Sequence, residues 1–228
     1  MATSYSPKII TDGLVLCLDA GDGKSYSGSG NLATDRVSRG NCQLTNGVTF
    51  NSANGGAFTL DGSNDYITSP VPLEAGATTY TIEAVFKPHS NKTQVVWEQN
   101  TSSLGNGRRV CMILVSDGDG GFNGQSADRH DHMPYTLNEW HFWGITMDTS
   151  LVSNKIKMYI NGVFDSQGNT SNDGALNAGA DLALLGKKVT AYSEFFDGEI
   201  AQVRVYNRVL TASEVLQNYN ATKGRFGL

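Results

Sequence analysis

The sequence predicts an all-β protein built as an antiparallel two-sheet β-sandwich with one short C-terminal helix. Several segments of six to eight residues alternate between apolar and polar side chains, which is the period of a half-buried strand. The chain has 228 residues, with 26 glycines against 5 prolines, and many of the glycines directly follow an Asp or Asn. Such Asx-Gly pairs favour turns with positive φ, and their density between short alternating segments indicates antiparallel strands.

The strands are expected in a regular order along the chain. Residues 1–12 are polar and are predicted to form an extended N-terminal arm, and the first strand follows at about Leu14–Asp19. In the segment 80–87, apolar and polar residues take alternate positions, which is typical of a sheet with one solvent-facing side. The further strong strands are predicted at Tyr80–Lys87, Gln94–Gln99, Arg109–Val115, His141–Asp148 and Lys155–Ile160.

The C-terminal stretch predicts a turn followed by a closing strand. Asp197-Gly198 is interpreted as the turn, and the strand is expected over Ile200–Tyr206. Strict alternation would then divide the strand into two faces. Ala201, Val203 and Val205 would share one face, and the other face would carry Ile200, Gln202, Arg204 and Tyr206.

A capped helix is predicted after this strand. Thr211 has the pattern of an N-cap, because Glu214 follows three residues later and completes a capping box. Leu210 and Val215 stand where a hydrophobic staple would pack. The helix is expected over residues 212–219, and residues 211–228 are predicted to form a capping helix and tail.

Six segments, taken in order, resemble laminin-G-like jelly rolls of the concanavalin A-like lectin/glucanase class. The resemblance covers nearly the whole chain, so we expect one jelly-roll domain over residues 1–228. The final segment carries the turn, closing strand, "Tyr-Asn-Arg-x-Leu" and capped helix that are typical of these domains. The six segments are Asp12–Ala20, Phe58–Ile67, Thr79–Pro88, Glu139–Thr146, Lys157–Val163 and Phe196–Val215.

Within this class the chain is similar to domains of tailed bacteriophages. Three segments carry that resemblance, namely Thr11–Ala20, Leu44–Phe50 and Asn51–Gly56. The stretch Leu32–Asn41 departs from the phage pattern, which usually has a Trp and a "Ser-Gly-Asn-Gly-Asn" turn there. The resemblance implies a structural accessory protein of a virion, either a capsid decoration or head fibre or a tail component. Its expected partners are other virion proteins, further copies of itself in a homo-oligomer, and host-surface glycans.

Composition excludes several other classes of function. The net charge is −5 and the basic residues are scattered, whereas nucleic-acid binding needs a basic stripe. The sequence contains no apolar run of 18 residues, so no membrane insertion is expected. Residues 1–8 lack the charged and apolar regions of a signal peptide, so we expect a protein made in the host cytoplasm and located in the virion. Cys17, Cys42 and Cys111 are odd in number and widely spaced, and no disulfide framework is predicted.

Glycoside hydrolysis is a candidate activity, because related sandwiches include glucanases. A retaining glycosidase needs two carboxyl groups about 5 Å apart, and strand positions two or four apart would supply them. The nearest match is Glu194-Phe-Phe-Asp-Gly-Glu199, in which the first spacing is three, so Glu194 should point away from Asp197 and Glu199. The sequence has no Gly-x-Ser-x-Gly elbow. A non-enzyme is therefore predicted.

The long irregular segment 116–135 contains the candidate metal ligands. Asp117, Asp119 and Asp128 resemble a calcium loop, but Phe122 stands where an EF-hand needs glycine. His130 and His132 alternate and would point the same way in an extended chain, as ligands of one Zn or Ni ion do. No cofactor is required by these patterns, and Ca²⁺ is the ion this loop would admit. Outside the loop, Asp19, Asp61 and Asp65 are interpreted as turn caps.

Glycan binding would use aromatic side chains as stacking platforms. The candidates are Tyr135 and Tyr192, both in predicted loops, and Trp97. Trp143 shares a predicted strand face with Ile145 and Met147 and is assigned to the core. The sequence therefore favours a non-enzymatic virion protein that binds glycans, with a free-standing carbohydrate-binding lectin module as the alternative and a glycoside hydrolase third.

Overall fold

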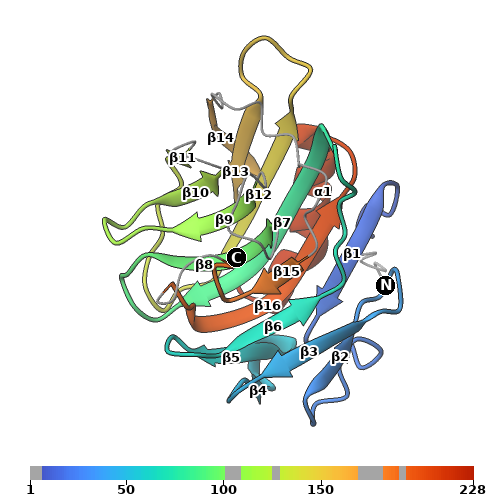
Figure 1. Ribbon diagram of the computed structural model, residues 1–228, viewed down its shortest axis with the longest axis vertical. Helices are drawn as coiled ribbons and strands as arrows, with labels where there is room; N and C mark the ends of the chain where they lie inside the picture. Colours follow the sequence, from blue (N-terminus) through green and yellow to red (C-terminus); the bar gives the residue numbers. More distant parts are fainter. Residues whose placement is uncertain (1–6, 101–108, 125–128, 169–181, 190–193) are drawn as a thin grey trace, which may run out of the picture.

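The computed structural model describes residues 7–100, 109–124, 129–168, 182–189 and 194–228, with no side chains described for 129–131. Two antiparallel eight-stranded sheets pack face to face (Figure 1). This arrangement confirms the predicted all-β sandwich with one C-terminal helix. No helix among the described residues is both long enough and apolar enough to cross a bilayer.

The two sheets have the following strand orders. Sheet A runs β14 (Val163–Gly168), β13 (Ile156–Ile160), β12 (His141–Asp148), β7 (Thr79–Pro88), β16 (Asp197–Tyr206), β5 (Ala57–Asp61) and β4 (Thr49–Asn51), with β1 (Leu14–Asp19) also paired to β16. Sheet B runs β11 (Arg129–Asp131), β10 (Gly120–Asn123), β9 (Val110–Leu114), β8 (Gln94–Asn100), β15 (Leu182–Leu185), β6 (Tyr66–Ser69), β3 (Asn41–Thr45) and β2 (Leu32–Thr34). The short elements η1 (Ala53–Gly55) and η2 (Lys223–Arg225) flank them.

The main core lies between the sheets and is built from alternate residues of each strand. Tyr80, Ile82, Ala84 and Phe86 of β7 all belong to it, as the alternation predicts. Trp143 of β12 is fully buried and packs edge-on against Phe86, with ring centroids 4.9 Å apart. The assignment of Trp143 to the core is thus confirmed.

The prediction that the other face of β7 meets solvent is wrong. Thr81 and Glu83 on that face are 0% and 1% exposed. A second hydrophobic cluster, which includes Val85, Tyr206 and Val215, lies on this side and joins sheet A to the helix. The outer face of sheet A is therefore covered by the C-terminal part of the chain (Figure 1).

The closing strand differs from its prediction at two points. Asp197-Gly198 is not a turn, because both residues belong to β16 and Gly198 pairs with Leu60 and Pro88. Gly198 has φ 150°, and a Cβ there would lie 2.2 Å from the carbonyl oxygen of Lys87 on β7. This close approach of the two backbones needs glycine.

A β-bulge between Ile200 and Gln202 also shifts the register of β16 against β7. The extra residue moves Ile200 to the face of Val203 and Val205 in the main core, and Ala201 to the opposite face. The predicted division of this strand into faces is therefore wrong for these two residues.

The helix α1 (Ala212–Thr222) begins as predicted and runs three residues further. Thr211 Oγ1 accepts from the Glu214 amide at 3.3 Å, and Glu214 Oε2 accepts from the Thr211 amide at 2.8 Å, which completes the capping box. Leu210 and Val215 are both buried in the second cluster. The helix also holds the N-terminal arm, because Asn218 Oδ1 accepts from the Ile10 amide at 2.7 Å.

Candidate functional site

The outer face of sheet B carries a row of buried polar side chains. Glu98 of β8 lies opposite Cys111 of β9, which lies opposite Asn123 of β10. Directly paired residues of an antiparallel sheet share a face. Cys111 packs with Val95 and Ile113 in a small cluster separate from the main core, so this row is on the outer face. We call Glu98, Asn100, Cys111 and Asn123 the sheet B row.

Glu98 is the most enclosed member of the sheet B row, with 0% exposure. Its Oε1 accepts from Asn100 Nδ2 at 2.9 Å, and its Oε2 accepts from the Val189 amide at 3.1 Å. Burial raises the pKa of the Glu98 carboxyl, and the donors together with Arg109 and Lys188 oppose that shift. Glu98 therefore orients its neighbours and is itself shielded from solvent.

Asn123 is the member that lacks a complete set of partners. It is 8% exposed, and its side-chain carbonyl oxygen has no hydrogen-bond partner among the described residues. Buried polar atoms in native proteins are nearly always paired, so an unpaired acceptor indicates a missing donor such as a ligand or water. The sheet B row thus offers a hydrogen-bond acceptor on a strand.

Charged side chains border the sheet B row. Lys188 Nζ lies 2.8 Å from Glu194 Oε1 and 2.6 Å from Oε2, so the ion pair engages both carboxylate oxygens. Arg109 Nε donates to the Gly124 carbonyl at 3.1 Å. Burial raises the pKa of the Cys111 thiol well above its usual value, so the thiol stays protonated and unreactive. Cys17 and Cys42 are buried free thiols too, which agrees with the absence of a predicted disulfide framework.

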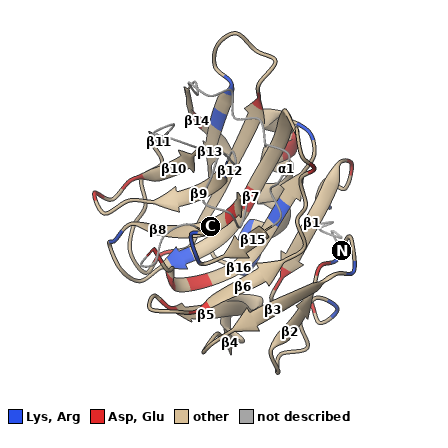
Figure 2. Ribbon diagram, in the orientation of Figure 1, with Lys and Arg blue, Asp and Glu red and all other residues tan. Residues whose placement is uncertain are grey.

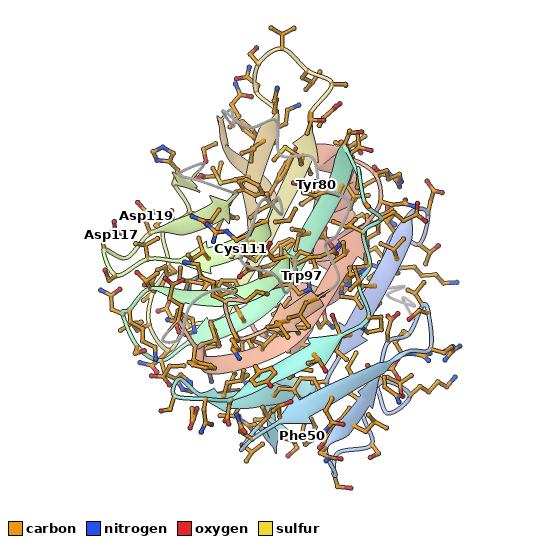
Figure 3. All side chains as sticks on the ribbon, viewed as in Figure 1. Phe50, Tyr80, Trp97, Cys111, Asp117 and Asp119 are labelled. Atoms are coloured by element: carbon orange, nitrogen blue, oxygen red, sulfur yellow. The ribbon has the colours of Figure 1, made fainter. Side chains whose placement is uncertain are left out.

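The two described aromatic residues predicted to bind glycan, Trp97 and Tyr135, do not form a stacking platform together. Trp97 is 0% exposed and lies in the main core, so it is unavailable as a stacking platform (Figure 3). A β-bulge between Val95 and Trp97 explains this correction, because it places both Val96 and Trp97 on the inner face. Tyr192 lies outside the described residues.

Tyr135 is half-buried and packs at the rim of the sandwich. Its hydroxyl oxygen lies 2.7 Å from both Asn91 Oδ1 and the Val115 carbonyl oxygen, and its ring contacts Trp143 edge-on. Burial raises the pKa of Tyr135 to about 12, and Asp117 and Asp119 add to that shift. Tyr135 is therefore held by the fold and presents only part of its ring.

The predicted metal ligands do not form a described site. Asp117 and Asp119 lie at the tip of the β9–β10 turn, where Asp117 Oδ1 accepts from the Asp119 amide at 3.2 Å (Figure 3). His132 is exposed just beyond β11. Asp128 lies outside the described residues, and so does the side chain of His130. Within the described ranges, no three His, Cys, Asp or Glu side chains come close enough to hold a metal ion.

Of the acidic residues considered for hydrolysis, Glu194 lies apart from Glu199, whereas Asp197 is two residues from Glu199 on β16. Glu194 binds Lys188, which follows β15 of sheet B, whereas Glu199 Oε1 lies 2.6 Å from Lys87 Nζ on sheet A. Asp61 and Asp65 accept backbone amides in turns, in agreement with their interpretation as turn caps. The carboxylates of Glu194, Glu199, Asp61 and Asp65 are thus each engaged locally.

The outer face of sheet A contains a second polar network, which is fully paired. Glu83 of β7 lies opposite Arg204 of β16, with Oε2 3.5 Å from the guanidinium, and red and blue segments adjoin on these strands (Figure 2). Asn218 of α1 donates to both Glu83 oxygens at 3.1 and 2.9 Å. Burial raises the pKa of the Glu83 carboxyl to about 7, although Arg204 and Asn218 lower it. The network locks the helix onto the sheet.

Sequence reasoning missed the sheet B row. The signal that was present is the run Glu98-Gln99-Asn100, three polar residues that follow Val-Val-Trp at the end of the strand Gln94–Asn100. A strand buried along its whole length that ends in polar residues indicates paired or ligand-binding side chains. The position of Asn123 beside them depends on the strand order and has no local signature.

Comparisons with known proteins place the fold. A family model described as the concanavalin A-like lectin/glucanases superfamily matches residues 61–216. No curated protein matches the chain. Trypanosoma rangeli sialidase in complex with sialic acid is similar over 97% of this chain, with 15% sequence identity and a TM-score of 0.71. This chain covers 36% of that sialidase chain, so it corresponds to one part of the larger protein.

Two further solved structures share the fold. One is domain 4 of AbnA, a GH43 extracellular arabinanase from Geobacillus stearothermophilus, in complex with arabinotriose. The alignment covers 90% of this chain and 98% of domain 4, with 18% sequence identity and a TM-score of 0.65. The other is the receptor binding domain of botulinum neurotoxin D. That alignment covers 91% of this chain and 52% of the neurotoxin chain, with 15% sequence identity and a TM-score of 0.65. The family match and the two-sheet architecture together show that this chain belongs to the concanavalin A-like lectin/glucanase superfamily.

Proposed function

We propose that this protein is a non-catalytic carbohydrate-binding domain that recognises a glycan at the outer face of sheet B. The unpaired Asn123 carbonyl oxygen carries the proposal, because a sugar hydroxyl is the donor that such an acceptor lacks. Lys188 and Arg109 at the border would donate to ring or hydroxyl oxygens. Glu98 acts indirectly, since it is enclosed and fixes the Asn100 amide.

A fold relative supports this choice of ligand. Domain 4 of AbnA, which this chain matches over almost its full length, was solved in complex with arabinotriose. That match is to a complete domain and not to a fragment of a larger unit, so it supports a binding module. The shared fold alone does not define the sugar.

The non-catalytic part of the proposal is supported by how the acidic side chains are engaged. Both oxygens of Glu98 accept hydrogen bonds, and Glu194 and Glu199 are each neutralised by a lysine. A retaining glycosidase needs one free carboxylate and one protonated carboxyl group about 5 Å apart. Among the described residues these three acidic groups do not offer that pair.

Glycan binding is tested by screening the full chain on a glycan array and measuring affinity for the best ligand by calorimetry. Replacing Asn123 by Leu removes the acceptor, and we expect an affinity loss of about tenfold, the value of one buried hydrogen bond. Asn41→Leu is the matched control, because Asn41 is exposed on β3 at the other end of the same sheet. No saturable binding on the array, or equal affinities of the two variants, would contradict the proposal.

A place on a bacteriophage particle is the second part of the proposal, and it rests on the three phage-like segments. The structure supplies a reason why two of them occur together. A Cβ on Gly21, next to the first segment, would lie 1.6 Å from the carbonyl oxygen of Gly55 in the segment Asn51–Gly56. Arg225 Nη2 donates to that carbonyl at 3.0 Å. The segments thus form one tightly packed corner.

Mass spectrometry of purified source particles tests this location. Many copies of the chain per particle would support a capsid decoration, and few copies would support a tail or fibre component. Absence of the chain from the particles would contradict a virion role and leave a free-standing lectin module. Glycan binding is independent of that result.

A further inference from the structure

A groove of about 400 Å³ lies on the outer face of sheet A, opposite the proposed glycan site. Its walls come from the N-terminal arm, β1, the loop that follows β1, the β2–β3 loop, β16, the end of α1 and the C-terminal tail. The volume is within the range of small-molecule sites, which is roughly 300–1,000 Å³. Its polar lining residues are Asp19, Asp22, Arg36, Gln202, Arg204 and Arg225.

The carboxylates of the groove are already saturated with donors. Asp19 accepts from the Gly21 amide at 2.9 Å, from Gln202 Nε2 at 2.6 Å and from Arg225 Nη1 at 3.0 and 2.8 Å. Asp22 accepts from the Lys24 amide at 2.9 Å and from Arg36 Nε at 2.7 Å. Asp22 stays ionised at neutral pH, because these two donors outweigh burial and lower its pKa.

Among the described guanidinium groups of the groove, in contrast, one buried nitrogen has no hydrogen-bond partner. Arg225 is held by Asp19, and Arg204 is held by Glu83, Gln202 and Thr222. Arg36 uses Nε for Asp22, but its Nη1 is buried and has no hydrogen-bond partner among the described residues. A guanidinium has five N–H donors in a fixed fork that suits a planar or tetrahedral oxyanion.

The charge and the apolar surface of the groove lining are compatible with an anionic ligand at Arg36. Three arginines and two aspartates line the groove, and Arg204 also pairs with Glu83 outside the lining, so no excess of negative charge opposes an anion there. Leu14 and Val37 add aliphatic surface beside the charged groups. An apolar wall next to a positive donor fits the carbon skeleton and the charged group of a small organic acid.

We propose that this groove is a second ligand site, which binds a small organic oxyanion through the free donor of Arg36. The ligand class is a compact molecule with a carboxylate, phosphate or sulfate group, such as an acidic sugar. This site is on the opposite face from the sheet B row and does not depend on the proposed glycan binding there.

The test is a calorimetric titration of the full chain with glucuronate, glucose 6-phosphate, glucose 6-sulfate and, as the neutral probe, glucose. We expect at least one anionic probe to bind and glucose not to bind. The relative affinities of the first three distinguish a carboxylate site from a phosphate or sulfate site. Binding of none of the anions, or equal affinity for glucose, would overturn the proposal.

Three variants assign the binding to the groove. Arg36→Gln should weaken binding about tenfold or more, the value of a charge-assisted hydrogen bond. Lys24→Gln, which removes the same charge from an exposed neighbour outside the groove, should leave the affinity unchanged. Asp22→Asn should strengthen binding, since it removes a negative charge and frees Arg36 Nε. This last variant keeps the test valid if Arg36→Gln fails to fold, and weaker binding by Asp22→Asn would overturn the proposal.

Discussion

Each outer face of the sandwich carries a cluster of buried polar side chains around a glutamate, and the two clusters are paired to different extents. On sheet A, the Glu83–Arg204 pair is closed by Asn218 from the helix, and every oxygen of Glu83 has a partner. On sheet B, Glu98 is equally buried and satisfied, but Asn123 in the same row keeps an unpaired acceptor. The Glu83 network holds the helix on sheet A, whereas the incompletely paired sheet B row is a place where a ligand would add stability.

Loss of Arg204 should produce the largest effect on stability. Arg204→Met leaves the Glu83 carboxyl buried without its cation, and removing one member of a buried pair typically costs about 3–5 kcal/mol. Urea unfolding at neutral to mildly basic pH measures the change in the free energy of unfolding. The double variant Glu83→Gln/Arg204→Met is the control, and it should be clearly more stable than Arg204→Met alone. Additive losses would show that the two side chains are not coupled.

The pH dependence of stability should report the same pair. The pKa of Glu83 is raised from 4.5 to about 7 in the folded protein. The contribution of this shift to the free energy of unfolding is therefore fully present below pH 4.5 and is lost as the pH rises through 7. A shift of this size corresponds to roughly 3 kcal/mol. Unfolding of the wild type should therefore become easier between these pH values, relative to Glu83→Gln. Parallel pH profiles of the two proteins would contradict the assignment.

Weakening the helix that covers sheet A should have a smaller effect. Thr211→Ala removes the N-cap and should cost about 1 kcal/mol. Thermal unfolding measures this loss, and Thr211→Ser, which keeps the hydroxyl group, is the control. The Arg208–Glu214 contact, with Nη2 2.7 Å from Oε1, lowers the pKa of Glu214 to about 2 and keeps half of the capping box intact in either variant. Equal losses in both variants would show that the hydroxyl is not the cap.

The fold could be predicted from the sequence wherever local pattern decides the structure. The inward-facing residues of β7, the capping box at Thr211 and the turn cap at Asp61 were confirmed, because each depends on neighbours within a few residues. Prediction failed at the two β-bulges, which turn Trp97 into the core and move Ala201 to the outer face. One inserted residue reverses the pattern of faces and has no signature in the sequence.

The candidate site was harder to predict than the fold. Glu98 and Asn100 lie on one strand, and their polar character was visible in the sequence. Asn123 joins them through two strand pairings, and Glu83 meets Asn218 across 135 positions of the chain. Such contacts depend on the order of strands in a sheet and on where the helix docks, and a local pattern contains neither.

Asn123→Leu should give the smallest change in stability and is the most direct test of the contrast between the two faces. Replacing an unpaired buried acceptor with an apolar side chain of similar size should raise the free energy of unfolding by up to about 1 kcal/mol. The same variant should lose the affinity for glycan that the wild type and Asn41→Leu retain. Greater stability with lost binding is the result we expect. A less stable variant that still binds glycan as tightly as the wild type would contradict the assignment of the sheet B row as the binding face.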